Sequence, residues 1–192
     1  MAQVPDRDCL VEVWTIALDI PREVLLTPDE QARADRFRFE RDRVHWTHAR
    51  SALRTILSGY LGTAPLDLSF TLGPHGKPGL PGLEFNLSHA SGWAMIAVST
   101  CAEVGIDLES IRSNIDMGKL LERIGEPSSG GSPKDLFQLW SRREAKTKAL
   151  GGALMDIPSG DVRVVDLAAP AGFVAALALV GRDPLVRYCG GE

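Results

Sequence analysis

The alternation of hydrophobic and polar residues along the chain predicts short strands and two long helical segments. Residues 10–18 alternate in part, are rich in β-branched and aromatic side chains and end before Pro21, so we expect a first strand there. Residues 27–30 read Thr-Pro-Asp-Glu, which combines an N-cap, a proline in the first turn and two acids at the positive end of the helix dipole. A helical pattern continues over residues 31–61 with a break near residues 39–42, and its apolar stripe predicts a buried face.

The same kinds of element recur along the rest of the chain and indicate a repeated organisation. Further strands are expected at 67–72, 83–88, 93–99, 103–109, 161–166 and 172–180, and further helices at 117–124 and 133–150. The glycine- and serine-rich stretch 125–133 is expected to be a flexible loop. Because the order strand, helix, strands occurs twice, we expect an α+β fold, a pseudo-dimer of two similar α/β lobes. These lobes, residues 1–102 and 103–192, would form one compact unit with the active site between them.

The composition is that of an ordinary globular protein, with 192 residues, 44% apolar and 24% charged. A net charge of −4 argues against nonspecific binding to nucleic acid or anionic membranes, which requires a large positive field. The longest apolar run, 173–180, is shorter than the roughly 20 residues that span a bilayer, and the start of the chain lacks a signal-peptide pattern. Cys9, Cys101 and Cys189 are isolated and odd in number, so neither a disulfide framework nor a zinc site is expected. These features predict a reducing, cytoplasmic location, and the pseudo-repeat predicts a monomer.

Two carboxylates in the second half stand on one face of an expected strand. Asp107 and Glu109 are two positions apart, which places their Cα atoms about 6.5 to 7 Å from each other. An alternative is a solvated strand face with Ile106 and Leu108 turned inward. Gly105, immediately before the pair, weakens this alternative, because a glycine within a strand often marks a close approach by another backbone or a ligand.

A third carboxylate lies on the helix expected at 133–150. Trp140, Glu144 and Lys148 recur every four residues and form one stripe, although a solvated Glu–Lys pair worth a few tenths of a kcal/mol is the simpler interpretation. Together with Asp107 and Glu109, Glu144 would supply hard oxygen ligands suited to Mg²⁺ and a phosphorylated substrate. Without a cation, three clustered acids would repel one another.

Groups that could receive phosphate are concentrated in the first half. Between residues 31 and 54 there are seven arginines against three acids, and Arg36, Arg43, Arg50 and Arg54 fall on one helical stripe. A solvated face with ion pairs explains this pattern equally well. Residues 76–78 read Gly-Lys-Pro and lack the hydroxyl that a Walker A loop needs after its lysine.

One polar segment ends the strand expected at 83–88. Residues 86–89 read Asn-Leu-Ser-His, and their hydroxyl and imidazole could bind phosphate or satisfy a sheet edge. No serine-hydrolase elbow accompanies them, so a serine nucleophile has little support.

These segments, read in order, resemble the 4′-phosphopantetheinyl transferase superfamily, in particular its larger two-lobed Sfp-type group. The matching segments are Gly76-Lys77-Pro78, Phe85-Asn86-Leu87-Ser88-His89, Gly105-Ile106-Asp107-Leu108-Glu109 and Trp140-Ser141-Arg142-Arg143-Glu144-Ala145-Lys146-Thr147-Lys148. The resemblance implies transfer of the 4′-phosphopantetheine arm of coenzyme A to a serine of an acyl or peptidyl carrier protein, with 3′,5′-ADP released. It does not indicate whether fatty-acid, polyketide or nonribosomal-peptide synthesis is served.

The resemblance also assigns roles to individual residues. Magnesium would be held by Asp107, Glu109 and Glu144. Catalytic groups would be Glu144, Lys148 and His89. Coenzyme A would be bound by Lys77, Pro78, Ser88, His89, Lys148, Arg33, Arg36 and Arg43. Either Glu144 or a metal-bound water would accept the serine proton.

This sequence departs from the family pattern in three places. Arg143 stands where a lysine is usual, the segment 110–139 is altered and short, and the tail after Gly151 is short. Two other functions therefore stay open: a noncatalytic module that binds coenzyme A or a carrier, and a metal-dependent hydrolase of the coenzyme A pyrophosphate.

Overall fold

The computed structural model describes residues 8–123, 125, 131–152 and 160–190, and these form an α+β fold. The first sheet has the order β4-β5-β1-β9, and its strands are β1 (Asp8–Ala17), β4 (Glu84–Ala90), β5 (Trp93–Ser99) and β9 (Asp183–Cys189). The second sheet has the order β6-β8-β7, and its strands are β6 (Val104–Ser110), β7 (Val162–Leu167) and β8 (Phe173–Val180). The helices are α1 (Pro28–Ala34), α2 (Glu40–Leu61), α3 (Met117–Arg123) and α4 (Pro133–Ala149).

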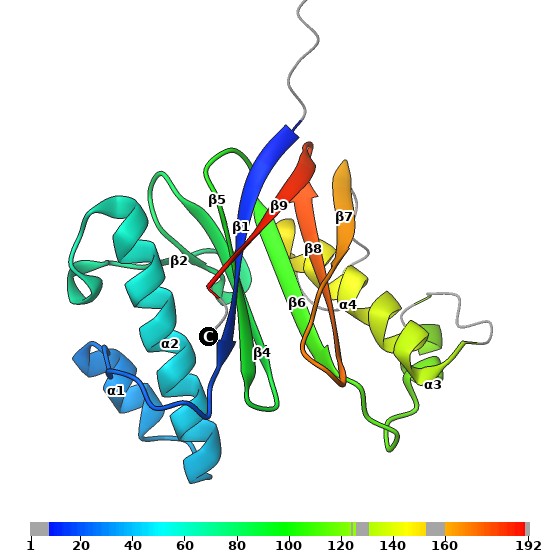
Figure 1. Ribbon diagram of the computed structural model, residues 1–192, viewed down its shortest axis with the longest axis horizontal. Coiled ribbons are helices and arrows are strands. Elements are labelled where there is room, and N and C mark those ends of the chain that lie inside the picture. Colours follow the sequence, from blue (N-terminus) through cyan, green and yellow to red (C-terminus); the bar gives the residue numbers. More distant parts are fainter. Residues whose placement is uncertain (1–7, 124, 126–130, 153–159, 191–192) are drawn as a thin grey trace, which may run out of the picture.

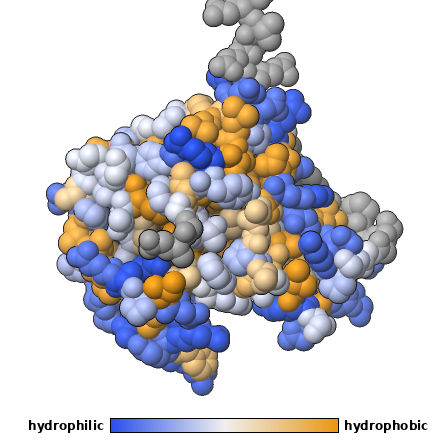
Figure 2. All heavy atoms as spheres, viewed as in Figure 1, coloured by the Kyte–Doolittle hydropathy of each residue, from blue (hydrophilic) through white to orange (hydrophobic). Residues whose placement is uncertain are grey.

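Each sheet carries one long helix on its outer face, while the inner faces share a core. Helix α2 packs on the first sheet and α4 on the second (Figure 1). Between the sheets lies an apolar cluster to which β1, β5, β6 and β8 all contribute, for example Val13, Met95, Leu108 and Leu177, each no more than 1% exposed. In Figure 2, hydrophilic side chains gather over α1 and the start of α2, where the arginine-rich segment lies.

Most of the expected elements are present, because their patterns are local. Thr27 caps α1 as expected, here within a capping box with Glu30, and the helical stretch breaks before α2 begins at Glu40. The strand expected at 67–72 is present only at its end: a 3₁₀ turn (Pro65–Asp67) precedes a two-residue strand, β2 (Thr71–Leu72), which pairs with β3 (Pro78–Gly79). The chain turns here because the side chain of Leu68 packs in the core under α2. The expected loop 125–133 lies partly outside the described residues.

No pattern in the sequence indicated the last strand, β9. It pairs in parallel with β1, with Val186 opposite Val11, so the chain returns to the first sheet after completing the second. Leu185 and Tyr188 are each 52% exposed, and Pro184 interrupts the pattern, so no clear alternation marked this segment. As a result, the first sheet draws strands from both halves of the chain.

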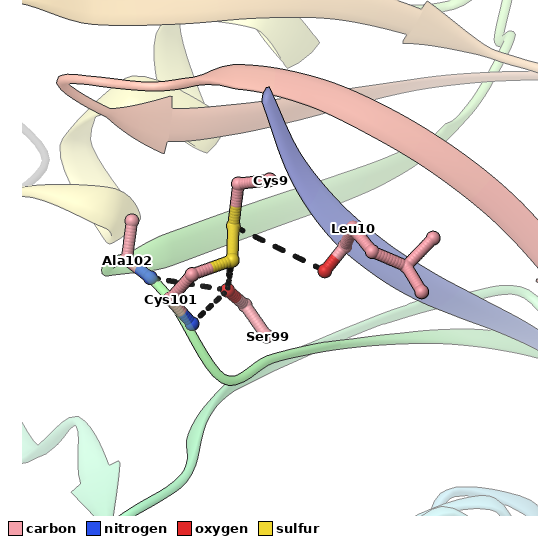
Figure 3. Close-up of a disulfide and its surroundings, with 5 residues drawn as sticks. All are labelled: Cys9, Leu10, Ser99, Cys101 and Ala102. Carbon is pink, nitrogen blue, oxygen red and sulfur yellow. Dashed lines mark hydrogen bonds between the residues drawn. A yellow bond between two sulfur atoms is a disulfide. The ribbon is translucent and has the colours of Figure 1, made fainter. Parts of the chain in front are cut away.

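Two of the three cysteines form a disulfide, and the prediction that none would is wrong. Cys9 and Cys101 are bonded, with their Cα atoms 6.0 Å apart (Figure 3). Strands β1 and β5 are antiparallel neighbours, and their pairing of Val11 with Ser99 carries the two cysteines together across 92 positions of sequence. The cysteines therefore no longer support a reducing compartment. None of the helices within the described ranges is long and apolar enough to cross a membrane.

Candidate active site

Helix α4 lies directly on strand β6, and Gly105 makes this approach possible. A Cβ atom at Gly105 would lie 2.1 Å from the carbonyl oxygen of Ala145 and 2.4 Å from the amide nitrogen of Ala149. On the neighbouring strand β8, the small buried side chains of Ala176 and Ala178 also pack under the helix. The interpretation of Gly105 as a point of close backbone approach is confirmed, and this approach brings the polar stripe of α4 to β6.

The stripe of α4 meets β6 at an ion pair between half-buried Lys148 and buried Asp107. Lys148 Nζ lies 2.6 Å from Asp107 Oδ1, and Ser88 Oγ donates a hydrogen bond of 3.1 Å to the same oxygen. Asp107 is only 3% exposed, so the alternative of a solvated strand face is wrong. Lys148 also donates to Ser88 Oγ at 3.2 Å and to the carbonyl oxygen of Ile106 at 3.3 Å. The lysine of the stripe thus bridges both sheets instead of lying on a solvated helix face.

The two sheets meet along β4 and β6 through side chains. The amide of Ile106 donates to Asn86 Oδ1 at 2.9 Å, and the amide of Leu108 donates to Ser88 Oγ at 3.2 Å. Figure 1 shows these two strands running side by side. Asn86 and Ser88 therefore satisfy the edge of β6, which is the structural alternative considered for this segment.

Glu109 and Glu144 lie within electrostatic reach of Asp107. Trp140 Nε1 donates to Glu109 Oε1 at 3.2 Å. Burial raises the pKa of Glu109, and the charge of Asp107 raises it further. Burial also raises the pKa of Glu144 to about 7; nearby Lys148 opposes this increase, while Asp107 and Glu109 add to it. Asp107, Glu109 and Glu144 are therefore close enough for their charges to act on one another.

These acids satisfy part of what a metal site requires. Asp107 Oδ2 and Glu144 Oε1 are buried and have no hydrogen-bond partner in the described structure, and such hard oxygens suit Mg²⁺. However, within the described residues no three His, Cys, Asp or Glu side chains stand close enough to form a ready-made metal site. Lys148 is the cation beside Asp107 in this arrangement. The residue types therefore fit a divalent ion, although the described side chains do not form a complete ligand set.

A cavity of about 200 Å³ between α2 and β4 is lined by Arg33, Trp46, Arg50 and His89, among others. The Arg33 guanidinium lies over the Trp46 ring, 5.3 Å from its centroid. Desolvation lowers the pKa of His89, and the positive charge of Lys148 lowers it further. Arginine and imidazole beside an aromatic ring make this cavity suitable for a phosphorylated aromatic ligand.

A smaller cavity of about 190 Å³ lies next to this one. Gly76, Pro78 and Asn86 line both cavities, and Lys77 and Lys148 line the smaller one. Cationic side chains thus continue from the arginine-rich helix to the ion pair at β6.

Arg36 and Arg43, which the resemblance assigned to coenzyme A, and Arg54 of the same stripe lie outside the lining of these two cavities. Arg36 is exposed, and Arg43 donates to Glu40 at 2.8 and 2.6 Å on the surface. Arg54 is 2% exposed and binds Glu30 at 2.8 and 2.9 Å, so it stabilises the fold. Arg50, which the sequence marked only as part of a stripe, lines the larger cavity. Helical spacing alone could not separate these roles.

Comparison with known proteins identifies the family. Residues 14–101 match the family model described as 4′-phosphopantetheinyl transferase, N-terminal. The 4′-phosphopantetheinyl transferase HetI of Nostoc sp. is 37% identical over 165 residues, which cover 75% of this chain and 70% of HetI. The chain belongs to the 4′-phosphopantetheinyl transferase family. A putative 4′-phosphopantetheinyl transferase of Synechocystis sp., slr0495, is 32% identical over 158 residues, covering 73% of this chain and 64% of that protein. A 4′-phosphopantetheinyl transferase of Bacillus subtilis is 32% identical over 125 residues, covering 59% and 55%.

The structure shows where two of the departures from the family pattern lie in this phosphopantetheinyl transferase. Arg143 is 5% exposed within α4, and its charge lowers the pKa of the neighbouring Glu144, so a positive charge is kept beside the acids. In the altered segment, Met117 and Leu121 of α3 pack against Phe137 and Trp140 of α4. This packing supports the N-terminal part of α4.

Proposed function

We propose that this protein transfers the 4′-phosphopantetheine arm of coenzyme A to a serine of an acyl or peptidyl carrier protein. In this reaction the serine oxygen attacks the phosphorus next to the pantetheine, the pyrophosphate bond breaks, and 3′,5′-ADP leaves. The observation that carries the proposal is the contact of Asp107 with Ser88 and Lys148 where the two sheets touch, beside Glu109 and Glu144. Phosphoryl transfer depends mainly on charge neutralisation and positioning, which such a cluster provides.

The proposed roles follow the chemistry of the side chains. Asp107, Glu109 and Glu144 would hold Mg²⁺, and the support for this is the pair of unpartnered carboxylate oxygens together with the raised pKa values of the two glutamates. The ion would neutralise charge on the pyrophosphate. Either Glu144, in its ionised form, or a metal-bound water molecule would accept the serine proton.

The binding groups for coenzyme A would lie along the two adjacent cavities. Lys148 and His89 would contact the phosphates, and Arg33 would contact the nucleotide end near Trp46. Arg50 also lines the larger cavity, but its guanidinium is paired with Glu30, so we do not add it to this set. Arg43 is also left out of the proposed coenzyme A-binding set, because its guanidinium group is paired with Glu40.

We further propose that the molecule is a monomeric pseudo-dimer of the Sfp type, with lobes at 1–102 and 103–192 and the active site between them. The support is that each sheet carries one long helix on its outer face and that the candidate site lies at the contact of β4 with β6. In this description β9 is a strand that the second lobe contributes to the first. The cytoplasmic location stays a prediction.

The direct test is mass spectrometry of several apo carrier proteins after incubation with coenzyme A, Mg²⁺ and this protein. A mass gain of one phosphopantetheine supports the proposal. Release of phosphopantetheine with no mass gain on any carrier would indicate the hydrolase. Tight coenzyme A binding with no transfer would indicate the noncatalytic module. Each of these results contradicts transferase activity.

The Asp107→Asn variant tests the cluster itself. We expect transfer to fall by about 100-fold or more, because one of the three carboxylates proposed to hold Mg²⁺ loses its charge. Asparagine is preferable to alanine, since the buried position and the partners of Asp107 mean that truncation would also destabilise the fold. Asp67→Asn, at an exposed position in the 3₁₀ turn before β2, is the matched control and should keep full activity. Equal activity in both variants would reject the assignment.

A further inference from the structure

The side chain of Lys77 leaves its own loop and reaches the second half of the chain. The backbone around it forms a closed turn in which the amide of Gly73 donates to the carbonyl oxygen of Lys77 at 2.8 Å. From there Lys77 Nζ donates to the carbonyl oxygen of Val104 at 3.1 Å and to that of Lys148 at 2.9 Å. The ammonium group is thus engaged by two backbone carbonyls that belong to different elements.

These two carbonyls lie where α4 comes closest to β6. Val104 begins β6 and directly precedes Gly105, where an added Cβ atom would lie 3.0 Å from the carbonyl carbon of Lys148. Lys148 is in the last turn of α4, where its carbonyl oxygen also accepts a hydrogen bond from the Gly151 amide at 3.3 Å and where a positive charge is favourable. A single ammonium group therefore joins the end of the helix to the start of the strand.

The burial of Lys77 also requires these partners. The side chain is half-buried, and desolvation lowers its pKa, an effect that Glu84 and Glu103 oppose. A partly desolvated ammonium group is costly unless its donors are satisfied, and here two of its three N–H groups are used by the protein. The resemblance alone would have assigned this ammonium group to coenzyme A.

We propose that Lys77 is a positioning residue, which fastens the end of α4 to β6 and thereby holds the Lys148 side chain against Asp107 and Ser88. The backbone that Lys77 binds is that of Lys148 itself, so a shift of this turn moves the lysine ammonium directly. The inference rests on the proposed transferase function, in which Lys148 contacts phosphate. It differs from direct substrate binding because Lys77 acts through another residue.

Steady-state kinetics of Lys77→Met test the proposal. Methionine keeps the length and apolar character of the stem and removes the donors. We expect kcat to fall about 10- to 100-fold, because displacement of a catalytic group by about 1 Å costs that much, while KM for coenzyme A stays within about twofold. Lys77→Arg, which keeps the charge and donors, should recover part of the loss. Lys119→Met, at an exposed lysine of α3, is the control and should leave both constants unchanged.

A second measurement does not depend on turnover. Amide hydrogen exchange of Lys77→Met should accelerate at Leu150 and Gly151, whose amides close the end of α4, and at the start of β6, but not in α2. A large rise in KM with kcat unchanged, or unaltered exchange at these amides, would overturn the proposal. If the wild-type protein transfers nothing, the proposed function fails, and the exchange data alone then decide the role of Lys77.

Discussion

Replacing Gly105 with alanine should displace α4 from β6 and reduce activity more than stability. The added Cβ would lie 2.1 Å from the carbonyl oxygen of Ala145, whereas real Cβ atoms essentially never come within 3.0 Å of a non-bonded atom. Both nearest atoms belong to the backbone of α4 and cannot rotate away. The helix must therefore move outward by about 1 Å, and Glu144 and Lys148 move with it.

The expected magnitudes follow from this displacement. Overpacking of this kind costs about 1–3 kcal/mol, so a folded but weakened protein is expected. A shift of about 1 Å in the catalytic groups should lower transfer to a carrier protein by about 100-fold. Urea unfolding measures the first quantity, and the initial rate of carrier modification at saturating coenzyme A measures the second.

Gly59 provides a matched control within α2. A Cβ atom there would meet nothing within 4 Å, so Gly59→Ala should keep activity and increase stability by up to about 1 kcal/mol through helix propensity. If Gly105→Ala unfolded at the same urea concentration as the wild type and transferred at the same rate, the close packing of α4 on β6 would be wrong.

Two further predictions concern stability. Burial alone would raise the pKa of Glu30, but hydrogen bonds from Arg54, the Thr27 amide and Arg50 lower it from 4.5 to about 2, so its contribution is present above pH 4.5 and is lost as the pH falls towards 2. Urea unfolding at pH 6 and pH 3 should show that Glu30→Gln removes this acid-sensitive part, about 3 kcal/mol at pH 6, and an unchanged acid slope would contradict the assignment. Reducing the Cys9–Cys101 bond, which closes a span of 92 positions, should cost about 4–5 kcal/mol in the chain-entropy description, and an identical unfolding midpoint with and without dithiothreitol would show that the bond is absent.

Several features of the candidate site could be predicted from local sequence. The spacing of Glu144 and Lys148 placed them on one helix face, and Gly105 marked the strand on which that helix rests. The strand pattern left open whether Asp107 lies on a solvated face. Such a pattern does not show whether a polar face meets solvent or another element, and here α4 and β4 cover it.

The amino-acid sequence by itself determined the type and approximate bounds of most helices and strands, because capping residues, turns and hydrophobic periodicity act over a few neighbouring positions. Its motifs were also sufficient to indicate the family. Only the tertiary structure decided the parallel pairing of β9 with β1, the disulfide, and the hydrogen bonds by which Lys77 joins α4 to β6. Each of these joins residues far apart in the chain, and such contacts depend on how the sheets pack, which no local pattern encodes.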